Sequence, residues 1–155
     1  MVRIKSLLGA ILIILSIYYA WPLIKQALPA KESISKTKDG VQWTPYSQEA
    51  VDKAKSNQQP VIIDFYADWC LACVEMDELT FSQKIIMDKS KDFVMLKVDA
   101  TNDFPELRDL QSKYKVVGLP TMIFIDSDGT MRNELTLTGF EKAELFIKRM
   151  SQLVP

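Results

Sequence analysis

Histidine is absent from this sequence of 155 residues, and cysteine occurs only twice, at Cys70 and Cys73. The lack of histidine excludes Ser-His-Asp and Cys-His catalysis, His-containing zinc sites and imidazole acid-base chemistry near neutral pH. Two thiolates alone do not complete the four-ligand set of a structural zinc site. We therefore interpret the cysteine pair as redox-active or as a small structural disulfide, and we expect no metal and no organic cofactor.

Glycine and proline are also scarce, with 5 and 7 residues, whereas hydrophobic residues make up 48% of the chain. This composition excludes disordered, collagen-like and low-complexity proteins and is sufficient for one packed domain. Residues 1–30 carry three basic side chains and no acidic one, so the rest of the chain holds 16 basic and 20 acidic side chains, a net charge of −4. Such an acidic balance argues against a nucleic-acid partner.

The N-terminal part contains a long uncharged stretch, the nineteen residues between Lys5 and Lys25. At about 1.5 Å per residue, a helix of this length crosses a hydrocarbon core of about 30 Å. We predict a single N-terminal transmembrane helix in residues 1–24, a polar linker in residues 25–40 and a folded domain in residues 41–155. A cleaved signal peptide and a buried core helix are the alternatives, but the stretch has neither an A-x-A-like cleavage site nor a polar face.

The folded domain shows an alternation of predicted strands and helices. Residues 61–67 and 93–98 are nearly continuous apolar runs, which are typical of strands buried on both faces. Apolar spacing predicts helices over 47–57, from Cys70 onward, around 104–114 and from Glu141 onward. Further short strands are predicted at 41–43, 121–125 and 132–137, the last two joined by a turn at 126–129. This order predicts an α/β fold with a central mixed sheet and helices on both faces.

The cysteine pair follows directly from the first of these buried strands and opens a helix. This context is more specific than a bare C-x-x-C spacing. Cys70 lies at the predicted helix N-terminus, where free backbone N–H groups favour a thiolate, so we predict that Cys70 is the nucleophile. Cys73 would then attack Cys70 in a mixed disulfide and release the reduced substrate. The alternative is a structural staple, but closing so small a loop removes little entropy from the unfolded chain.

The residues around this pair resemble a known family. The segment DFYADWCLAC, with Trp69 before the first cysteine, and the later segment GLPT resemble the two signatures of the thioredoxin superfamily. More narrowly, YADWCLACVEMDELTFS, VDATND, VVGLPTMIFID and LTGF resemble the C-terminal thioredoxin-like domain of the DsbD family, membrane thiol:disulfide interchange reductases of the bacterial periplasm. The resemblance covers residues 41–155 and implies a thioredoxin fold. It does not extend to the family's large membrane domain or its N-terminal periplasmic domain.

The resemblance also implies roles for individual residues. Pro120 would be a cis-proline beside the disulfide, and the backbone of Leu119 would pair with the substrate chain. Asp64 would lie buried behind the disulfide with a raised pKa and take the proton of Cys73. Asp77 matches a second acid near the site, where the family usually carries the longer Glu. The alternatives are an ordinary trans turn at Pro120, a solvated acid at Asp64 and a mere surface charge at Asp77.

The charge around the pair bears on the direction of electron transfer. Between Ser56 and Gln83 there are five acidic residues and no Lys or Arg, which disfavours a thiolate and predicts a reductant. We expect Trp69 to shape the surface around Cys70. The sequence thus predicts a disulfide reductase anchored in the bacterial inner membrane with its domain in the periplasm, which takes electrons from a membrane donor and acts on protein disulfides. An oxidase or isomerase, and a non-catalytic assembly module with a structural disulfide, are the alternatives.

Overall fold

The computed structural model describes residues 40–154, which form a five-stranded mixed sheet. Its strand order is β1-β3-β2-β4-β5, in which β1, β3 and β2 run parallel and β4 runs antiparallel to both β2 and β5. The strands are β1 (Thr44–Pro45), β2 (Val61–Tyr66), β3 (Val94–Asp99), β4 (Thr121–Ile125) and β5 (Leu137–Thr138).

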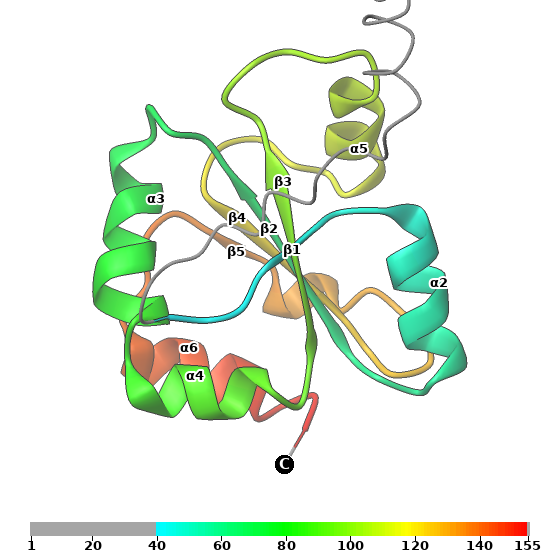
Figure 1. Ribbon diagram of the computed structural model, residues 1–155, viewed down its shortest axis with the longest axis vertical. Helices are drawn as coiled ribbons and strands as arrows, with labels where there is room; N and C mark the ends of the chain where they lie inside the picture. Colours follow the sequence, from blue (N-terminus) through cyan, green and yellow to red (C-terminus); the bar gives the residue numbers. More distant parts are fainter. Residues whose placement is uncertain (1–39, 155) are drawn as a thin grey trace, which may run out of the picture. The chain divides into compact units, whose positions relative to one another are not determined.

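Helices cover both faces of this sheet (Figure 1). One face packs against α2 and α5, and the other packs against α4, α6 and the helical segment that follows the cysteines. The α/β architecture predicted from the sequence is therefore confirmed. The helices are α2 (Gln48–Ser56), α3 (Leu71–Glu75), the π-helix η1 (Met76–Phe81), α4 (Lys84–Ser90), α5 (Leu107–Lys113), the 3-10 helix η2 (Asn133–Leu135) and α6 (Ala143–Met150).

The central strand β2 supplies side chains to both hydrophobic clusters because successive residues of a strand face opposite sides. Ile62 belongs to the cluster under α4 and α6, whereas Ile63 and Phe65 belong to the cluster under α2 and α5. Asp64 takes the same face as Ile62, between β3 and β4. A single acidic side chain is thereby buried beneath the segment that carries the cysteines.

The helix predicted from Cys70 onward is not one uniform α-helix in the structure. It changes from α3 into η1 at Met76, ends at Phe81, and is followed by the separate helix α4. The wide π turn keeps Met76 and Phe81 buried against the core, and the hydroxyl of Thr80 donates a hydrogen bond to the carbonyl of Glu141 at 2.6 Å. This contact ties the segment after the cysteines to the chain that enters α6.

Two predicted strands differ from the observed ones. The first strand lies at 44–45 instead of 41–43, because Val41 and Trp43 turn into the core before pairing with β3 begins. The predicted strand 132–137 is interrupted by η2, which buries Leu135, so that pairing with β4 is limited to Leu137–Thr138 and an isolated bridge from Met131 to Ile125. Arg132 forms salt bridges with Asp126 and Glu134 at this bend.

No helix within residues 40–154 is both long and apolar enough to cross a membrane. The predicted transmembrane helix (1–24) and nearly all of the predicted linker (25–40) lie outside the described residues, so these two predictions stay predictions.

Candidate redox site

Cys70 and Cys73 form a disulfide at the start of α3. Cys70 is the N-cap residue of this helix, and its sulfur accepts a hydrogen bond from the backbone N–H of Cys73 at 3.2 Å. Both cysteines are largely buried, and the partly buried side chain of Leu119 packs against the cluster they form with Ala67. The expectation that the pair opens a helix directly after a buried strand is confirmed.

The turn before the cysteines is fixed by Thr101 from the segment after β3. The hydroxyl of Thr101 accepts a hydrogen bond from the backbone N–H of Asp68 at 3.0 Å, and its carbonyl accepts one from Nε1 of Trp69 at 3.2 Å. The Trp69 side chain is nevertheless 69% exposed, so it is oriented without being buried. Thr101 was missed at the sequence level, although it lies in the VDATND segment that carries the family resemblance.

Pro120 lies in a separate turn, directly before β4, and the Leu119–Pro120 peptide bond is cis. The hydroxyl of Thr121 donates a hydrogen bond to the Gly118 carbonyl at 2.8 Å, which closes the turn ahead of β4. Trp69 and Leu119 line one shallow hollow together with Val117, whose side chain is 91% exposed. The structure thus places Trp69, expected to shape the surface around Cys70, and Leu119, expected to pair with a substrate chain, at one hollow next to cis-Pro120.

Asp64 lies behind the disulfide, in the middle of β2, and only 2% of its surface is exposed. Burial raises the pKa of its carboxyl group from 3.8 to about 7, because the charged form loses its hydration. The ammonium of Lys97 opposes this rise and the charge of Asp77 adds to it. Since Oδ1 of Asp64 has no hydrogen-bond partner, one oxygen of a carboxyl group that titrates near neutrality stays free.

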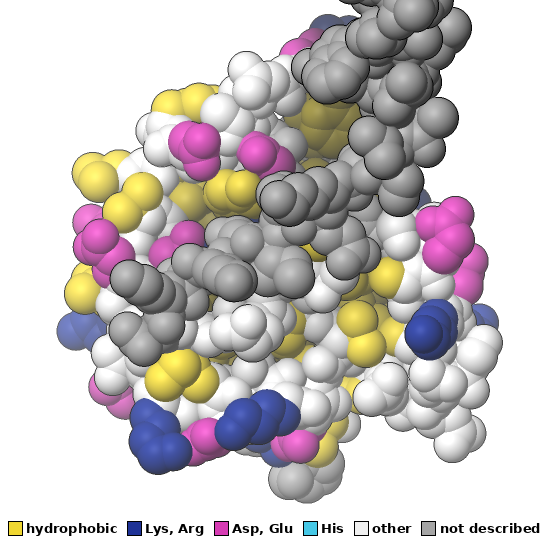
Figure 2. All heavy atoms as spheres, viewed as in Figure 1, with side chains coloured by type: hydrophobic (Ala, Val, Ile, Leu, Met, Phe, Trp, Pro, Cys, Tyr) yellow, Lys and Arg dark blue, Asp and Glu magenta, His cyan; other side chains and the backbone are white. Residues whose placement is uncertain are grey.

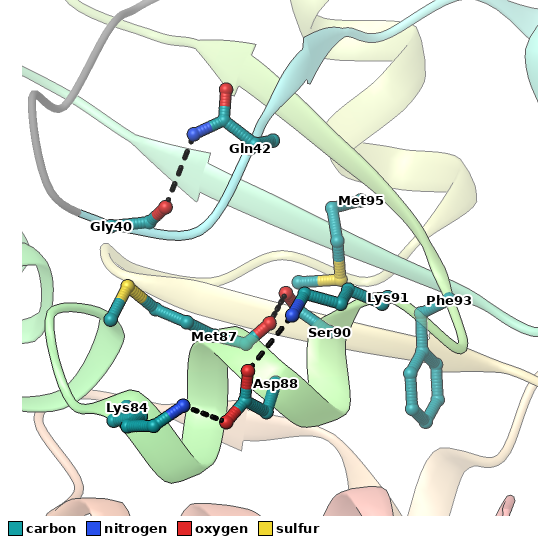
Figure 3. A pocket seen from close by; sticks show the side chains of 9 residues that line it. All are labelled: Gly40, Gln42, Lys84, Met87, Asp88, Ser90, Lys91, Phe93 and Met95. Atoms are coloured by element: carbon teal, nitrogen blue, oxygen red, sulfur yellow. Dashed lines mark hydrogen bonds and ion pairs between the residues drawn. The ribbon is translucent and has the colours of Figure 1, made fainter.

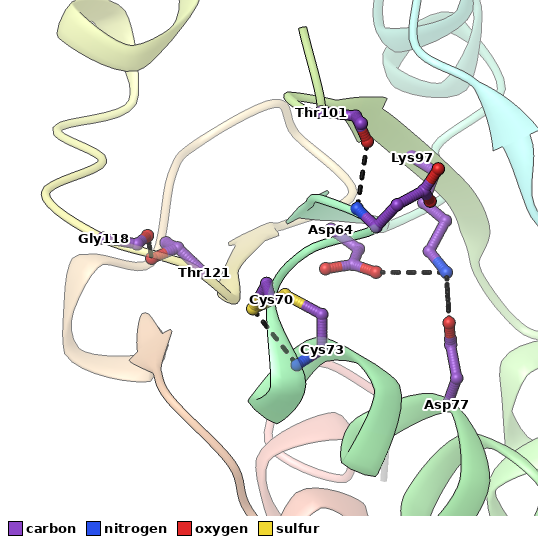
Figure 4. Close-up of a disulfide and its surroundings, with 9 residues drawn as sticks. Asp64, Cys70, Cys73, Asp77, Lys97, Thr101, Gly118 and Thr121 are labelled. Atoms are coloured by element: carbon purple, nitrogen blue, oxygen red, sulfur yellow. Dashed lines mark hydrogen bonds and ion pairs between the residues drawn. A yellow bond between two sulfur atoms is a disulfide. The ribbon is translucent and has the colours of Figure 1, made fainter.

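Lys97 is the central residue of a buried ion-pair cluster (Figure 4). It pairs in register with Asp64 across the β2–β3 ladder, and its Nζ lies 3.6 Å from Oδ2 of Asp64. The same Nζ donates hydrogen bonds to both carboxylate oxygens of Asp77 on η1, at 2.9 and 3.0 Å. Asp77 therefore lies near the site as predicted, but it contacts Lys97, and its link to Asp64 runs through that lysine.

Sequence reasoning missed Lys97, although a signal for it existed. The runs VIIDFY and VMLKVD are both strongly apolar, and each is interrupted by one charged residue of opposite sign. Two such residues on neighbouring buried strands are expected to pair, because an isolated buried charge is costly. Two aromatic rings complete the surroundings of the ammonium, with the Tyr66 ring centroid 4.4 Å and the Trp43 ring centroid 5.4 Å from Nζ. Partial burial raises the pKa of Tyr66 to about 12.

Comparisons with known proteins identify the family to which a chain with this fold and cysteine pair belongs. A thioredoxin-like family model matches residues 42–127. The chain belongs to the thioredoxin-like family. Within residues 40–154, this thioredoxin-like chain has no group of three or more cysteine or acidic side chains placed to hold a metal ion.

Curated relatives of this thioredoxin-like chain carry the name thiol:disulfide interchange protein DsbD. The protein from Pseudomonas fluorescens is 39% identical over 105 residues, which are 68% of this chain and 18% of the relative. The protein from Vibrio cholerae is 32% identical over 153 residues, which are 96% of this chain and 25% of the relative. The chain thus spans a quarter or less of the length of these relatives.

Solved structures extend the comparison to the fold. The C-terminal domain of DsbD from Neisseria meningitidis, in its reduced form, has a TM-score of 0.61 and 33% identity; the match covers 68% of this chain and 92% of that domain. A thioredoxin from Thermus thermophilus has a TM-score of 0.61 and 27% identity, covering 73% of this chain and 86% of the other. The resemblance to the thioredoxin superfamily and to the DsbD C-terminal domain is confirmed.

Proposed function

We propose that this chain is a membrane-anchored disulfide reductase that acts outside the cytoplasm through Cys70 and Cys73. The observation that carries the proposal is the disulfide at the start of α3, with the buried carboxyl group of Asp64, whose pKa is raised to about 7, next to it in Figure 4. The predicted apolar segment in residues 1–24 would be the anchor in the bacterial inner membrane, with the folded domain in the periplasm. A separate membrane protein would supply the electrons, and no metal or organic cofactor would be needed.

The reaction would proceed through two thiol-disulfide exchanges. The thiolate of Cys70 attacks a substrate disulfide, so that a bond forms between Cys70 and one substrate sulfur while the other sulfur leaves as a thiolate and is protonated. Asp64 then takes the proton of Cys73, and the Cys73 thiolate attacks the sulfur of Cys70. The Cys70–Cys73 disulfide forms as the second substrate sulfur leaves, so the substrate gains two electrons and the protein loses two.

The surface around the disulfide supports an extended substrate chain. Trp69 and Leu119 border the same hollow, and Leu119 precedes the cis-proline beside the cysteines. In this role the backbone of Leu119 would pair with the substrate main chain, and the exposed apolar side chains would contact the residues that flank the substrate cysteine. The substrate class is therefore a protein disulfide in an accessible, extended segment.

The direction of electron flow follows from the charges near Cys70. Segment 56–83 carries five acidic residues and no basic one. Lys97, the basic residue nearest in space to Asp64, donates its hydrogen bonds to Asp77. A thiolate at Cys70 thus gains little from cations, and the reduced form is less favoured than in strongly oxidising relatives.

The reduction potential of the cysteine pair tests this proposal. The full chain in detergent would be equilibrated with glutathione or dithiothreitol buffers, and its dithiol fraction read from the mass added by alkylation. A potential of about −230 to −270 mV is expected for a reductase. A value above about −150 mV would indicate an oxidase, and one below about −300 mV would indicate a structural staple. The double variant Cys70→Ser/Cys73→Ser gives the alkylation background.

A further inference from the structure

The Lys97 ammonium lies at unequal distances from the two carboxylates that flank it. Its Nζ is 2.9 and 3.0 Å from the two oxygens of Asp77, but 3.6 Å from Oδ2 of Asp64. An N–H···O hydrogen bond requires a donor-acceptor distance of about 2.7–3.2 Å. Lys97 is therefore hydrogen-bonded to Asp77, whereas its contact with Asp64 is longer and weaker, although it still lowers the pKa of that carboxyl group.

Two further contacts hold the ammonium in this place. Nζ lies 4.4 Å from the centroid of the Tyr66 ring and 5.4 Å from that of Trp43, within the range of cation–π attraction. Oδ1 of Asp64 meanwhile has no hydrogen-bond partner, and Figure 4 shows this free oxygen on the side of the carboxyl group that faces the disulfide. The carboxyl group of Asp64 thus has the lysine on one side and the disulfide on the other.

We propose that Asp77 is a positioning residue that acts through Lys97. It holds the ammonium farther from Asp64 than a normal hydrogen bond requires, and this keeps Asp64 free to exchange a proton with Cys73. A charge-assisted hydrogen bond from Lys97 would stabilise the Asp64 carboxylate and make it a weaker base. Asp77 prevents this by accepting both hydrogen bonds itself. The inference rests on the proposed function, because it deepens the role of Asp64 in that reaction.

The groups that face Asp64 are few, so the effect of Asp77 can be isolated. They are Lys97 on β3, Asp77 on η1, Tyr66 on β2 and, in the reduced protein, the two thiols at the start of α3. On the other side β4 places Met122 opposite Asp64, and this strand has no charged residue. In the disulfide form the thiols do not titrate, and Lys97 and Asp77 are the charged neighbours that remain.

The test is the titration of Asp64 in the oxidised full chain in detergent, followed by the carboxyl ¹³C signal and assigned with Asp64→Asn. Asp77→Asn is expected to lower the pKa of Asp64 by about one unit or more, because the neutral amide accepts only weakly from Lys97 and a negative charge is removed. Asp77→Glu, which keeps an acceptor for Lys97, should restore a value close to that of the parent protein. In a Lys97→Met background, the shift caused by Asp77→Asn should fall to less than about half.

An equal shift in both backgrounds would show that Asp77 acts on Asp64 by its charge alone, and the proposal would fail. It would also fail if Asp77→Asn left the Asp64 titration unchanged or moved it upward. Lys97→Gln replaces Lys97→Met if the Met variant does not fold. Since only the disulfide form is titrated, the result is independent of whether Cys70 reduces any substrate, and the two proposals can fail separately.

Discussion

Two small charge clusters of this protein contain acidic and basic side chains in opposite proportions. Behind the disulfide, one lysine, Lys97, lies between two aspartates. On α4, one aspartate, Asp88, lies between two lysines, with its carboxylate oxygens 2.6 Å from Nζ of Lys84 and 2.8 Å from Nζ of Lys91 (Figure 3). Figure 2 shows Lys and Arg side chains next to acidic ones on this part of the molecular surface.

The two clusters move the pKa of their aspartates in opposite directions. Hydrogen bonds from Lys84 and Lys91 lower the pKa of the exposed Asp88 to about 2. Burial raises the pKa of Asp64 to about 7, although Lys97 lies close by. A lysine neighbour alone therefore does not decide the charge of an aspartate, and loss of hydration outweighs it where water is excluded. Only the buried cluster is suited to proton exchange near neutral pH.

The largest effect is expected when the buried acid is neutralised by Asp64→Asn. Because the pKa of Asp64 is raised from 3.8 to about 7 on folding, the folded chain binds this proton more tightly than the unfolded chain does. Its contribution to stability is complete below about pH 4 and is lost as the pH rises through 7, and three pKa units correspond to about 4 kcal/mol. Asp64→Asn should therefore be more stable than the parent by up to about 4 kcal/mol at pH 8.

Urea unfolding between pH 4 and pH 8 measures this difference. The variant and the parent should have similar free energies of unfolding near pH 4 and diverge as the pH rises. Parallel stability curves over the whole range would mean that Asp64 does not titrate between the two states in this window. Asp68→Asn, at an exposed acid four residues further along the chain, is the matched control.

A smaller effect of opposite sign, a loss of stability, is expected for Lys97→Met. This change removes the hydrogen bonds to Asp77 and the cation beside Asp64, and leaves a buried acid without a counter-charge. We expect the free energy of unfolding to fall by about 2–3 kcal/mol at pH 8, and by clearly less at pH 5, where Asp64 is protonated. An equal loss at both pH values would show that Lys97 stabilises the fold through Asp77 or through packing of its methylene groups, and not through Asp64.

The smallest effect is expected on the surface of α4. Asp88→Asn removes both ion pairs with Lys84 and Lys91, but all three side chains are well exposed to solvent. Exposed ion pairs contribute little, so we expect the melting temperature to change by no more than about 2 °C, and this change to vanish in 1 M salt because screening is nearly complete there. Calorimetry at low and high salt measures it, and a larger salt-independent loss would contradict the comparison.

Local sequence patterns predicted most of the framework of this protein. The apolar runs at β2 and β3 gave the central strands, Ser47 caps α2 by accepting a hydrogen bond from the N–H of Ala50, and the cysteine pair begins a helix. These features depend on residues close together in the chain. The burial of Asp64 and the cis bond at Pro120 were implied by the family resemblance, and the structure shows both.

The missed features depend on contacts between distant segments. Lys97 on β3 meets Asp77 on η1 through a contact between segments twenty positions apart along the chain. The π turn of η1 and the break before β5 likewise reflect how Met76 and Leu135 are buried against other elements. Periodicity along one segment carries no information on such packing.

The two edges of the sheet are short, and this has a consequence for the proposed action on extended chains. Strands β1 and β5 have two residues each, and Pro45 at the β1 edge has no N–H to donate. A long open edge would capture any partly unfolded chain as an additional strand and promote aggregation. Under the proposed function, a substrate polypeptide would find little free main chain at these two edges, which would favour brief contact at the disulfide over lasting binding.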